Sequence, residues 1–140
     1  MSEKKRIVIL GGGYAGVAAA KTLLKIFKRD NSVDLSLIDR HPYHTLMTEL
    51  HEIAGDRVEQ NAVQVSFKKI FGARRINIIQ DRIETIDFEN RKLKSTQNTY
   101  DYDYLLLGVG GEPEDFGIPG VKEHTFTLWS LKDALRLKDH

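Results

Sequence analysis

The chain has 140 residues, of which 41% are hydrophobic and 29% are charged, and its formal net charge is +1. This length and composition fit a soluble globular domain with its own core, and the nearly balanced charge excludes a strong field for nucleic acid. Cysteine is absent, which excludes disulfides, cysteine-bound metals, thiol nucleophiles and a redox-active cysteine pair.

The N-terminal residues do not have the pattern of a secretory signal peptide. Met-Ser-Glu-Lys-Lys-Arg leads directly into an apolar run, whereas a secretory signal has a longer apolar region and a cleavage site. No apolar run approaches the roughly 20 residues that cross a bilayer. We therefore expect a cytoplasmic protein.

The apolar run at 7–10, Ile-Val-Ile-Leu, is typical of a strand buried on both faces of a parallel sheet. Gly11, Gly13 and Gly16 follow with G-x-G-x-x-G spacing, and residues 15–24 predict a helix. Gly11 allows the tight turn, Gly13 lets the backbone approach a pyrophosphate, and Gly16 lets helix and strand pack closely. The positive end of the helix dipole would face the anion.

Residues 33–38 predict the second strand, and Asp39 stands at its carboxyl end. An acid in that place binds a ribose hydroxyl in dinucleotide sites. Asp39 also disfavours a 2′-phosphate, because two anions about 4 Å apart cost on the order of 4 kcal/mol near a protein surface, a cost that Arg40 would partly offset. The alternative is that Asp39 only caps a loop. With the glycine spacing before it, we interpret this region as a dinucleotide site.

Three histidines follow, His41, His44 and His51, and they raise a zinc hypothesis. A short helix is expected over 46–54, so His41 lies outside it, and position 55 is Gly where a His-Glu-x-x-His helix has its second histidine. We expect no metal and interpret these histidines as surface or loop-packing residues.

The middle of the chain predicts short elements that end in a second glycine junction. In order, they are a polar linker at 56–61, a helix at 65–72, a strand at 75–80, antiparallel strands at 81–88, 91–95 and 99–104, and an apolar strand at 104–107. The last strand runs into Gly-Val-Gly-Gly from Gly108, at the edge where open α/β sheets bind ligands. Tyr100, Tyr102 and Tyr104 alternate, so we interpret them as packing on one face rather than as a nucleic-acid platform.

Residues 112–120 predict an exit loop and 125–129 a further strand, and Ser130 looks like the N-cap of a helix with Asp133 in its first turn. The chain stops in that helix, so we expect it to be a piece of a longer protein. The expected fold class is α/β. A Rossmann-like domain with a parallel sheet and a three-stranded antiparallel meander would span 1–111, and a linker with the start of a helix would span 112–140.

This pattern resembles the two-dinucleotide-binding flavoproteins of the glutathione-reductase-like superfamily. Their FAD domain has the strand, glycine loop and helix, an acid after strand two, and then a three-stranded meander. Its next landmark is a strand that ends in an Ala-Thr-Gly-like turn beside the flavin, where this chain has Gly108 and Val109 in place of alanine and threonine.

Within the superfamily, the stretches from Tyr43 to Thr48, from Leu50 to Gly55 and from Phe116 to Gly120 are similar to the type II NADH dehydrogenases. That family passes a hydride from NADH to FAD and two electrons onward to a membrane quinone. The resemblance implies an FAD-binding part of such an enzyme, peripheral on the inner face of the cell membrane, with a quinone as partner and a homodimer as one assembly. No second glycine motif follows residue 16, so NADH would bind a domain outside this segment, and we expect the segment alone to be inactive.

The resemblance also assigns roles to single residues, with no catalytic residue and no metal among them. Gly11, Gly13, Tyr14, Ala15 and Gly16 would meet the pyrophosphate, Asp39 the ribose, Arg40 and Thr48 the flavin path, the Ile83 backbone the adenine, and Gly108 and Gly110 the flavin end. Two alternatives stay open: a related flavin-dependent reductase with a soluble acceptor, and a non-catalytic NAD-binding sensor module. The meander and the second glycine junction weigh against the sensor, because a plain Rossmann sensor needs neither.

Overall fold

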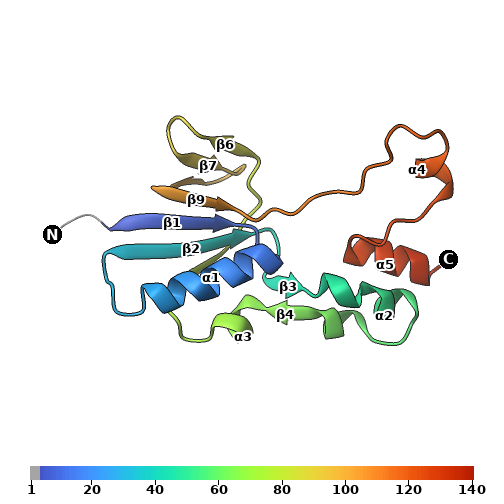
Figure 1. Cartoon of the computed structure of the whole chain (residues 1–140), viewed down its shortest axis with the longest axis horizontal. Coiled ribbons are helices and arrows are strands. Elements are labelled where there is room, and N and C mark those ends of the chain that lie inside the picture. The colour runs from blue at the N-terminus through green and yellow to red at the C-terminus, as the bar shows by residue number, and fades with distance from the viewer. Residues whose placement is uncertain (1–3) are drawn as a thin grey trace. The chain divides into compact units, whose positions relative to one another are not determined.

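The computed structural model describes residues 4–140, which form the mixed α/β structure of Figure 1. The strands are β1 (Lys5–Leu10), β2 (Val33–Asp39), β3 (Tyr43–Thr45), β4 (Gln64–Ser66), β5 (Asn77–Gln80), β6 (Thr85–Asp87), β7 (Lys92–Lys94), β8 (Thr99–Asp101) and β9 (Tyr104–Leu107). The helices are α1 (Tyr14–Ile26), α2 (Leu50–Ala54), α3 (Phe67–Phe71), α4 (Val121–His124) and α5 (Leu131–Lys138), with 3₁₀ helices η1 (Met47–Glu49) and η2 (Gln60–Val63).

The chain forms two compact units. Unit 1 takes the described residues up to His44 together with Ser66–Gly110, and unit 2 takes Thr45–Val65 and Gly111–His140. The expected domain boundary at residue 111 stays a prediction, and residues 45–65 group with the segment that follows that boundary.

Unit 1 is built on a four-stranded parallel sheet in the order β5-β2-β1-β9. In the register of the central strands, Ile9 of β1 lies between Leu37 of β2 and Leu106 of β9. Ile9 and Leu37 have no exposed surface, as expected for parallel strands covered on both faces. Since the strands point the same way, β1 and β9 run into the two glycine junctions at the edge where β2 ends at Asp39.

Alternate residues of β1 and β2 face two different layers. One face packs against α1 and α3 in a cluster of Ile9, Leu35, Leu37, Val17, Ala20, Phe67 and Phe71. The other face packs against the meander region in a cluster of Val8, Leu10, Ile38, Leu93 and Tyr102. Figure 1 shows α1 running alongside β1 and β2. Unit 1 therefore has a helix layer, a sheet and a meander layer, with both cores on the central strands.

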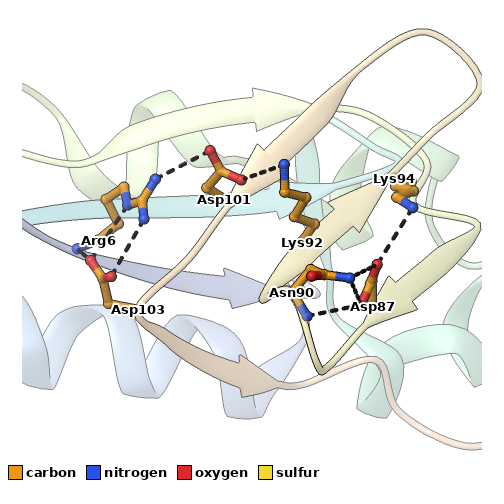
Figure 2. A network of polar contacts seen from close by, with 7 residues as sticks. All are labelled: Arg6, Asp87, Asn90, Lys92, Lys94, Asp101 and Asp103. Carbon is orange, nitrogen blue, oxygen red and sulfur yellow. Dashed lines mark hydrogen bonds and ion pairs between the residues drawn. The ribbon is translucent and has the colours of Figure 1, made fainter.

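The meander consists of β6, β7 and β8 in an antiparallel sheet. Leu93 of β7 pairs with Ile86 and Tyr100 and is fully buried. The neighbours of Leu93 point the other way and form ion pairs: Lys92 Nζ lies 3.6 Å from Asp101, and Lys94 Nζ lies 3.5 Å from Asp87 (Figure 2). One face of this small sheet is thus apolar and the other charged, the usual pattern of an antiparallel sheet with one solvated side.

Arg6 joins the meander to the first strand of the parallel sheet, as Figure 2 shows. Its backbone N–H donates to Asp103 Oδ2 at 2.7 Å, and its guanidinium lies 3.3 Å from Asp101. The backbone hydrogen bond is the main reason that the pKa of Asp103 is lowered. Asp103 returns a backbone N–H to Arg6 O at 2.9 Å, so β1 and the start of β9 are held together by hydrogen bonds in both directions.

Unit 2 has a separate apolar core, in which α2 packs against α5. Its fully buried side chains are Leu50, Ile53, Val63 and Ala134. The N-cap expected at Ser130 is confirmed as a full capping box: Ser130 Oγ accepts from Asp133 N at 3.1 Å, and Asp133 Oδ2 accepts from Ser130 N at 2.9 Å. The helix start is therefore closed by its own side chains.

The expected fold class, with a parallel sheet and a three-stranded antiparallel meander, is confirmed. The strand expected at 125–129 is wrong, because these residues are irregular. Phe126 lies 4.9 Å under the Arg136 guanidinium, and Trp129 Nε1 donates to Gly111 O. A strand at this place would need a partner strand to pair its backbone groups. The segment is instead held by these side-chain contacts.

Two details of the meander also differ from expectation. The strand expected at 81–88 is shortened to β6, with a loop before it. The row of three tyrosines on one face is wrong: Tyr100 lies in β8 and Tyr102 is buried, whereas Tyr104 opens β9 and is 62% exposed. The chain leaves the meander at Asp103 and enters the parallel sheet there, which breaks the alternation.

Asp81 stands where the parallel sheet passes into the meander. Its Oδ2 accepts hydrogen bonds from Tyr100 OH at 2.6 Å, Ser95 Oγ at 2.8 Å and Asn98 Nδ2 at 3.0 Å. These donors, Tyr100 first, lower the pKa of Asp81 to about 2. Burial and then the Asp81 carboxylate raise the pKa of Tyr100 to about 12.

The pKa of Asp81 predicts an acid-sensitive contribution to stability. Because the folded-state pKa lies below the usual 3.8, the contribution is complete above about pH 4 and is lost as the pH falls toward about 2. We expect Asp81→Asn to lower the urea midpoint at neutral pH and to lose less stability than the wild type on acidification. Glu89→Gln, in the exposed turn after β6, should follow the wild type. Urea unfolding at a series of pH values measures this, and identical pH dependence of Asp81→Asn and wild type would contradict it.

Candidate functional site

The turn from β1 into α1 packs backbone against backbone. Gly11 has a φ of +100°, and a Cβ there would lie 2.3 Å from Gly108 O. A Cβ on Gly16 would lie 1.8 Å from Gly11 O. Both contacts exclude any side chain, so the tight turn predicted for Gly11 and the close packing predicted for Gly16 are confirmed. The first helix is thereby held against the carboxyl ends of β1 and β9.

Gly12 lies inside this turn and is held from three sides. Its N–H donates to Asp39 Oδ2 at 2.6 Å, and its carbonyl accepts from His44 Nδ1 at 2.9 Å. A Cβ on Gly12 would lie 2.1 Å from the Phe67 ring. Gly12 stands at a variable position of the glycine motif and its partners come from distant parts of the chain, so no local sequence signal predicts these contacts.

The N-terminus of α1 has no side-chain cap. Gly13 is its N-cap with no side-chain hydrogen bond, and the described residues of the first turn include no acid. In contrast, Ser66 caps α3 and Ser130 caps α5. The first N–H groups of a helix have no acceptor within the helix and carry its positive dipole end. This end of α1 is therefore suited to an anion.

The space beside the Gly13 Cα is less crowded than at Gly11 and Gly16. The nearest atom that a Cβ on Gly13 would meet is Gly108 O, at 3.9 Å, which is an ordinary contact distance. The backbone can therefore be approached from this side, in contrast to the crowded positions at Gly11 and Gly16. This agrees with the role predicted for Gly13, although the pyrophosphate contact itself stays a prediction.

Asp39 turns its carboxylate toward the glycine loop. Oδ2 accepts from Gly12 N and Oδ1 accepts from His41 N at 2.8 Å. The hydrogen bond from His41 N caps the loop after β2, as in the alternative interpretation. The hydrogen bond from Gly12 N links the end of β2 to the glycine loop. A carboxylate oxygen accepts more than one hydrogen bond, so the same carboxylate has acceptor capacity left for a ribose hydroxyl.

His44 is the buried polar residue of this region, with 6% of its surface exposed. Besides the hydrogen bond to Gly12 O, its ring meets the Tyr14 ring edge-to-face, with centroids 4.7 Å apart. The other two histidines lie elsewhere: His41 stacks on Tyr43, and His51 contacts Glu52 in unit 2. The interpretation as a loop-packing residue therefore fits His44. The contact between His44 and the glycine loop is not predicted by any local sequence pattern.

The remaining predicted residues take different places. Gly108 N donates to Leu10 O at 2.8 Å and touches the glycine loop through its backbone. Gly110 has a φ of +79° and open space around it. The Ile83 side chain packs against the core under the meander. Arg40 is exposed, and Thr48 belongs to η1 of unit 2. Unit 1 thus brings together the two glycine junctions and Asp39.

Known proteins resemble this chain over nearly its whole length. The sequence profile of the family described as pyridine nucleotide-disulphide oxidoreductase matches residues 5–140. A type II NADH:quinone oxidoreductase of Staphylococcus aureus is 29% identical over 138 residues, which are 99% of this chain and 34% of that protein. The chain therefore spans about a third of the length of the curated relatives it matches.

Solved structures agree on the fold. The sulfide:quinone oxidoreductase from Aquifex aeolicus has a TM-score of 0.81 at 23% identity, covering 96% of this chain and 31% of that one. NDH2 from Plasmodium falciparum, in complex with RYL-552, has a TM-score of 0.76 at 26% identity, covering 97% of this chain and 28% of that one. The Rossmann-like architecture is thus shared with larger oxidoreductases.

The glycine geometry predicts that two neighbouring substitutions differ in effect. Gly16→Ala forces a methyl group against Gly11 O, so we expect a loss of at least about 2 kcal/mol of folding free energy. Gly13→Ala meets no close atom, so we expect a loss of about 1 kcal/mol or less, the ordinary cost of alanine at an N-cap. Chemical denaturation of both variants measures the difference, and equal losses would contradict the packing described here.

Proposed function

We propose that this chain is the FAD-binding part of a flavoprotein NADH dehydrogenase. The proposal starts from the family to which the chain belongs, the pyridine nucleotide-disulphide oxidoreductases. The parent enzyme would pass a hydride from NADH through FAD to a quinone. The relative named as a type II NADH:quinone oxidoreductase supports this choice within the family. Because the chain spans about a third of that relative, the activity is proposed for the longer protein.

The observation that carries the proposal is the N-terminus of α1 at the carboxyl edge of the sheet, which has neither a side-chain cap nor an acid in its first turn. Its first turn has N–H groups without acceptors in the helix, no side-chain cap and no acid among its described residues. A diphosphate supplies the negative charge and the acceptor oxygens that such a helix end lacks. Serine side chains cap α3 and α5, and α2 and α4 have an acid in the first turn, so α1 is the one α-helix of the described residues with neither a side-chain cap nor an acid there.

The residues around this end fit the rest of an FAD molecule. The backbone of Gly11, Gly13, Tyr14, Ala15 and Gly16 would hold the diphosphate. Asp39 would bind a ribose hydroxyl with its remaining acceptor capacity, and the backbone of Ile83 would meet the adenine. Gly108 and Gly110, with the space around Gly110, would leave room for the flavin end, and Arg40 and Thr48 would line its path.

FAD, when bound, would supply the hydride and electron chemistry. The chain's own task is to bind and orient the cofactor, so no acid–base residue of this segment is needed. NADH would bind in a part of the protein outside residues 1–140, because the glycine motif occurs once in this sequence.

The quinone, the attachment to the inner face of the cell membrane and a homodimer belong to the proposal for the parent protein. Among the described residues, no helix has both the length and the apolar composition needed to cross a bilayer. A flavin-dependent reductase with a soluble acceptor would use the same FAD-binding part, so the acceptor has to be measured on the longer protein. A non-catalytic NAD sensor is the less favoured candidate, because the meander and the second glycine junction exceed what it needs.

The proposal predicts a yellow protein. We expect the purified chain to bind FAD, and Gly13→Ala to weaken binding at least about tenfold, because a methyl group would stand where the diphosphate approaches. Gly110→Ala is not a suitable control because of its positive φ, whereas Glu89→Gln on the meander is. Absorption spectra and FAD titration measure this. A colourless chain that binds NAD and not FAD would favour the sensor and overturn the proposal.

The proposal also predicts that residues 1–140 alone do not catalyse NADH:quinone oxidoreduction. With FAD added, the chain should oxidise NADH no faster than free FAD does, because the NADH-binding part is not included. An NADH oxidation assay with a soluble quinone measures this. A rate typical of a complete enzyme would show that the division of labour proposed here is wrong.

A further inference from the structure

The peptide unit between Gly12 and Gly13 contains both a hydrogen bond to a buried histidine and an N–H of the candidate diphosphate site. The Gly12 carbonyl accepts from His44 Nδ1 at 2.9 Å. A trans peptide is planar, so its C=O and N–H point in opposite directions. With the carbonyl held on His44, the Gly13 N–H points away from His44.

Because Gly12 and Gly13 have no side chains, the peptide between them has little intrinsic preference for one orientation. Glycine adopts positive and negative φ almost equally, so a rotation of the peptide between two glycines is not opposed by side chains. Such a rotation would put the Gly12 carbonyl oxygen where the Gly13 N–H now points. A partial negative charge would then face a diphosphate, and the helix end would lose its first donor.

The preceding peptide is held in the same manner by another residue. The Gly12 N–H donates to Asp39 Oδ2 at 2.6 Å, and the Phe67 ring fills the space beside the Gly12 Cα. His44 itself is fixed, since it is 6% exposed and its ring lies edge-to-face against Tyr14. Two side chains from different elements thus determine both peptide planes of Gly12.

We propose that His44 is a positioning residue that orients the Gly12–Gly13 peptide so that the Gly13 N–H is aimed at the diphosphate of the bound dinucleotide. The inference rests on the proposed function for the identity of the ligand. Because a carbonyl oxygen can only accept, His44 must carry its hydrogen on Nδ1, in the neutral ring as well as in the protonated one. Replacing the donor lowers the fraction of chains with a competent loop, and the apparent Kd for FAD rises by the inverse of that fraction.

Two variants of His44 separate the hydrogen bond from the packing. Asn places an amide N–H close to the position of Nδ1, and Leu fills a similar volume without a donor. We expect His44→Leu to raise the Kd for FAD roughly tenfold or more, and His44→Asn to stay within about threefold of the wild type. His124→Leu, at an exposed histidine of α4 in unit 2, is the matched control and should bind FAD like the wild type.

The titrations are made with FAD at a temperature well below the melting temperature of each variant, which is measured separately. A lower melting temperature for His44→Leu with an unchanged Kd for FAD would mean that His44 only stabilises the fold, and would overturn the inference. Nitrogen NMR of the wild-type chain at alkaline pH gives a second readout without FAD: the Nδ1–H tautomer is expected, and the Nε2–H tautomer would overturn the inference too.

The two proposals fail in different ways. A wild-type chain that does not bind FAD overturns the proposed function, and the diphosphate as ligand falls with it. In that case the tautomer of His44 still decides whether the histidine holds the Gly12 peptide. A wild-type chain that binds FAD, with His44→Leu binding equally well, keeps the proposed function and overturns the inference.

Discussion

The contact of three glycine backbones at the end of the parallel sheet is the constraint on which the candidate site depends. Gly11 lies against Gly108, and Gly16 lies against Gly11, at distances that leave no room for a Cβ. These contacts bring the first turn of α1 down onto the ends of β1 and β9. The helix dipole and the second glycine junction therefore meet at one edge of the sheet.

The electrostatics of this edge follow from which helix ends are capped. Ser130 closes α5 with a full capping box and Ser66 closes α3, while α2 and α4 have no side-chain cap but an acid in the first turn. At α1 the N-cap is a glycine, and the nearby carboxylate of Asp39 bonds the loop rather than the helix end. A negative side chain at the helix end would compete with a bound anion, so the uncapped end and the position of Asp39 are consistent with one another.

The meander contributes by covering the sheet, not by forming the glycine junctions. Leu93 and Tyr102 close the second apolar face of β1 and β2, while the ion pairs of Lys92 and Lys94 keep the outer face solvated. Arg6 and Asp103 then connect this layer to β1 through the backbone. A strand such as β1, apolar on both faces, needs both layers before the loop that follows it can be held in one conformation.

The sequence by itself determined the elements whose signals are local. The spacing of Gly11, Gly13 and Gly16, the apolar strands beside them, Asp39 at the end of the second strand and the cap at Ser130 all depend on residues close together in the chain. The tertiary structure alone decided which distant groups reach the loop. His44 contacts Gly12 across 32 positions, Phe67 excludes a side chain from Gly12, and 125–129 is irregular because Phe126 and Trp129 find side-chain and backbone partners. Local patterns report backbone preference and burial, whereas these contacts exist only after the strands and helices have packed.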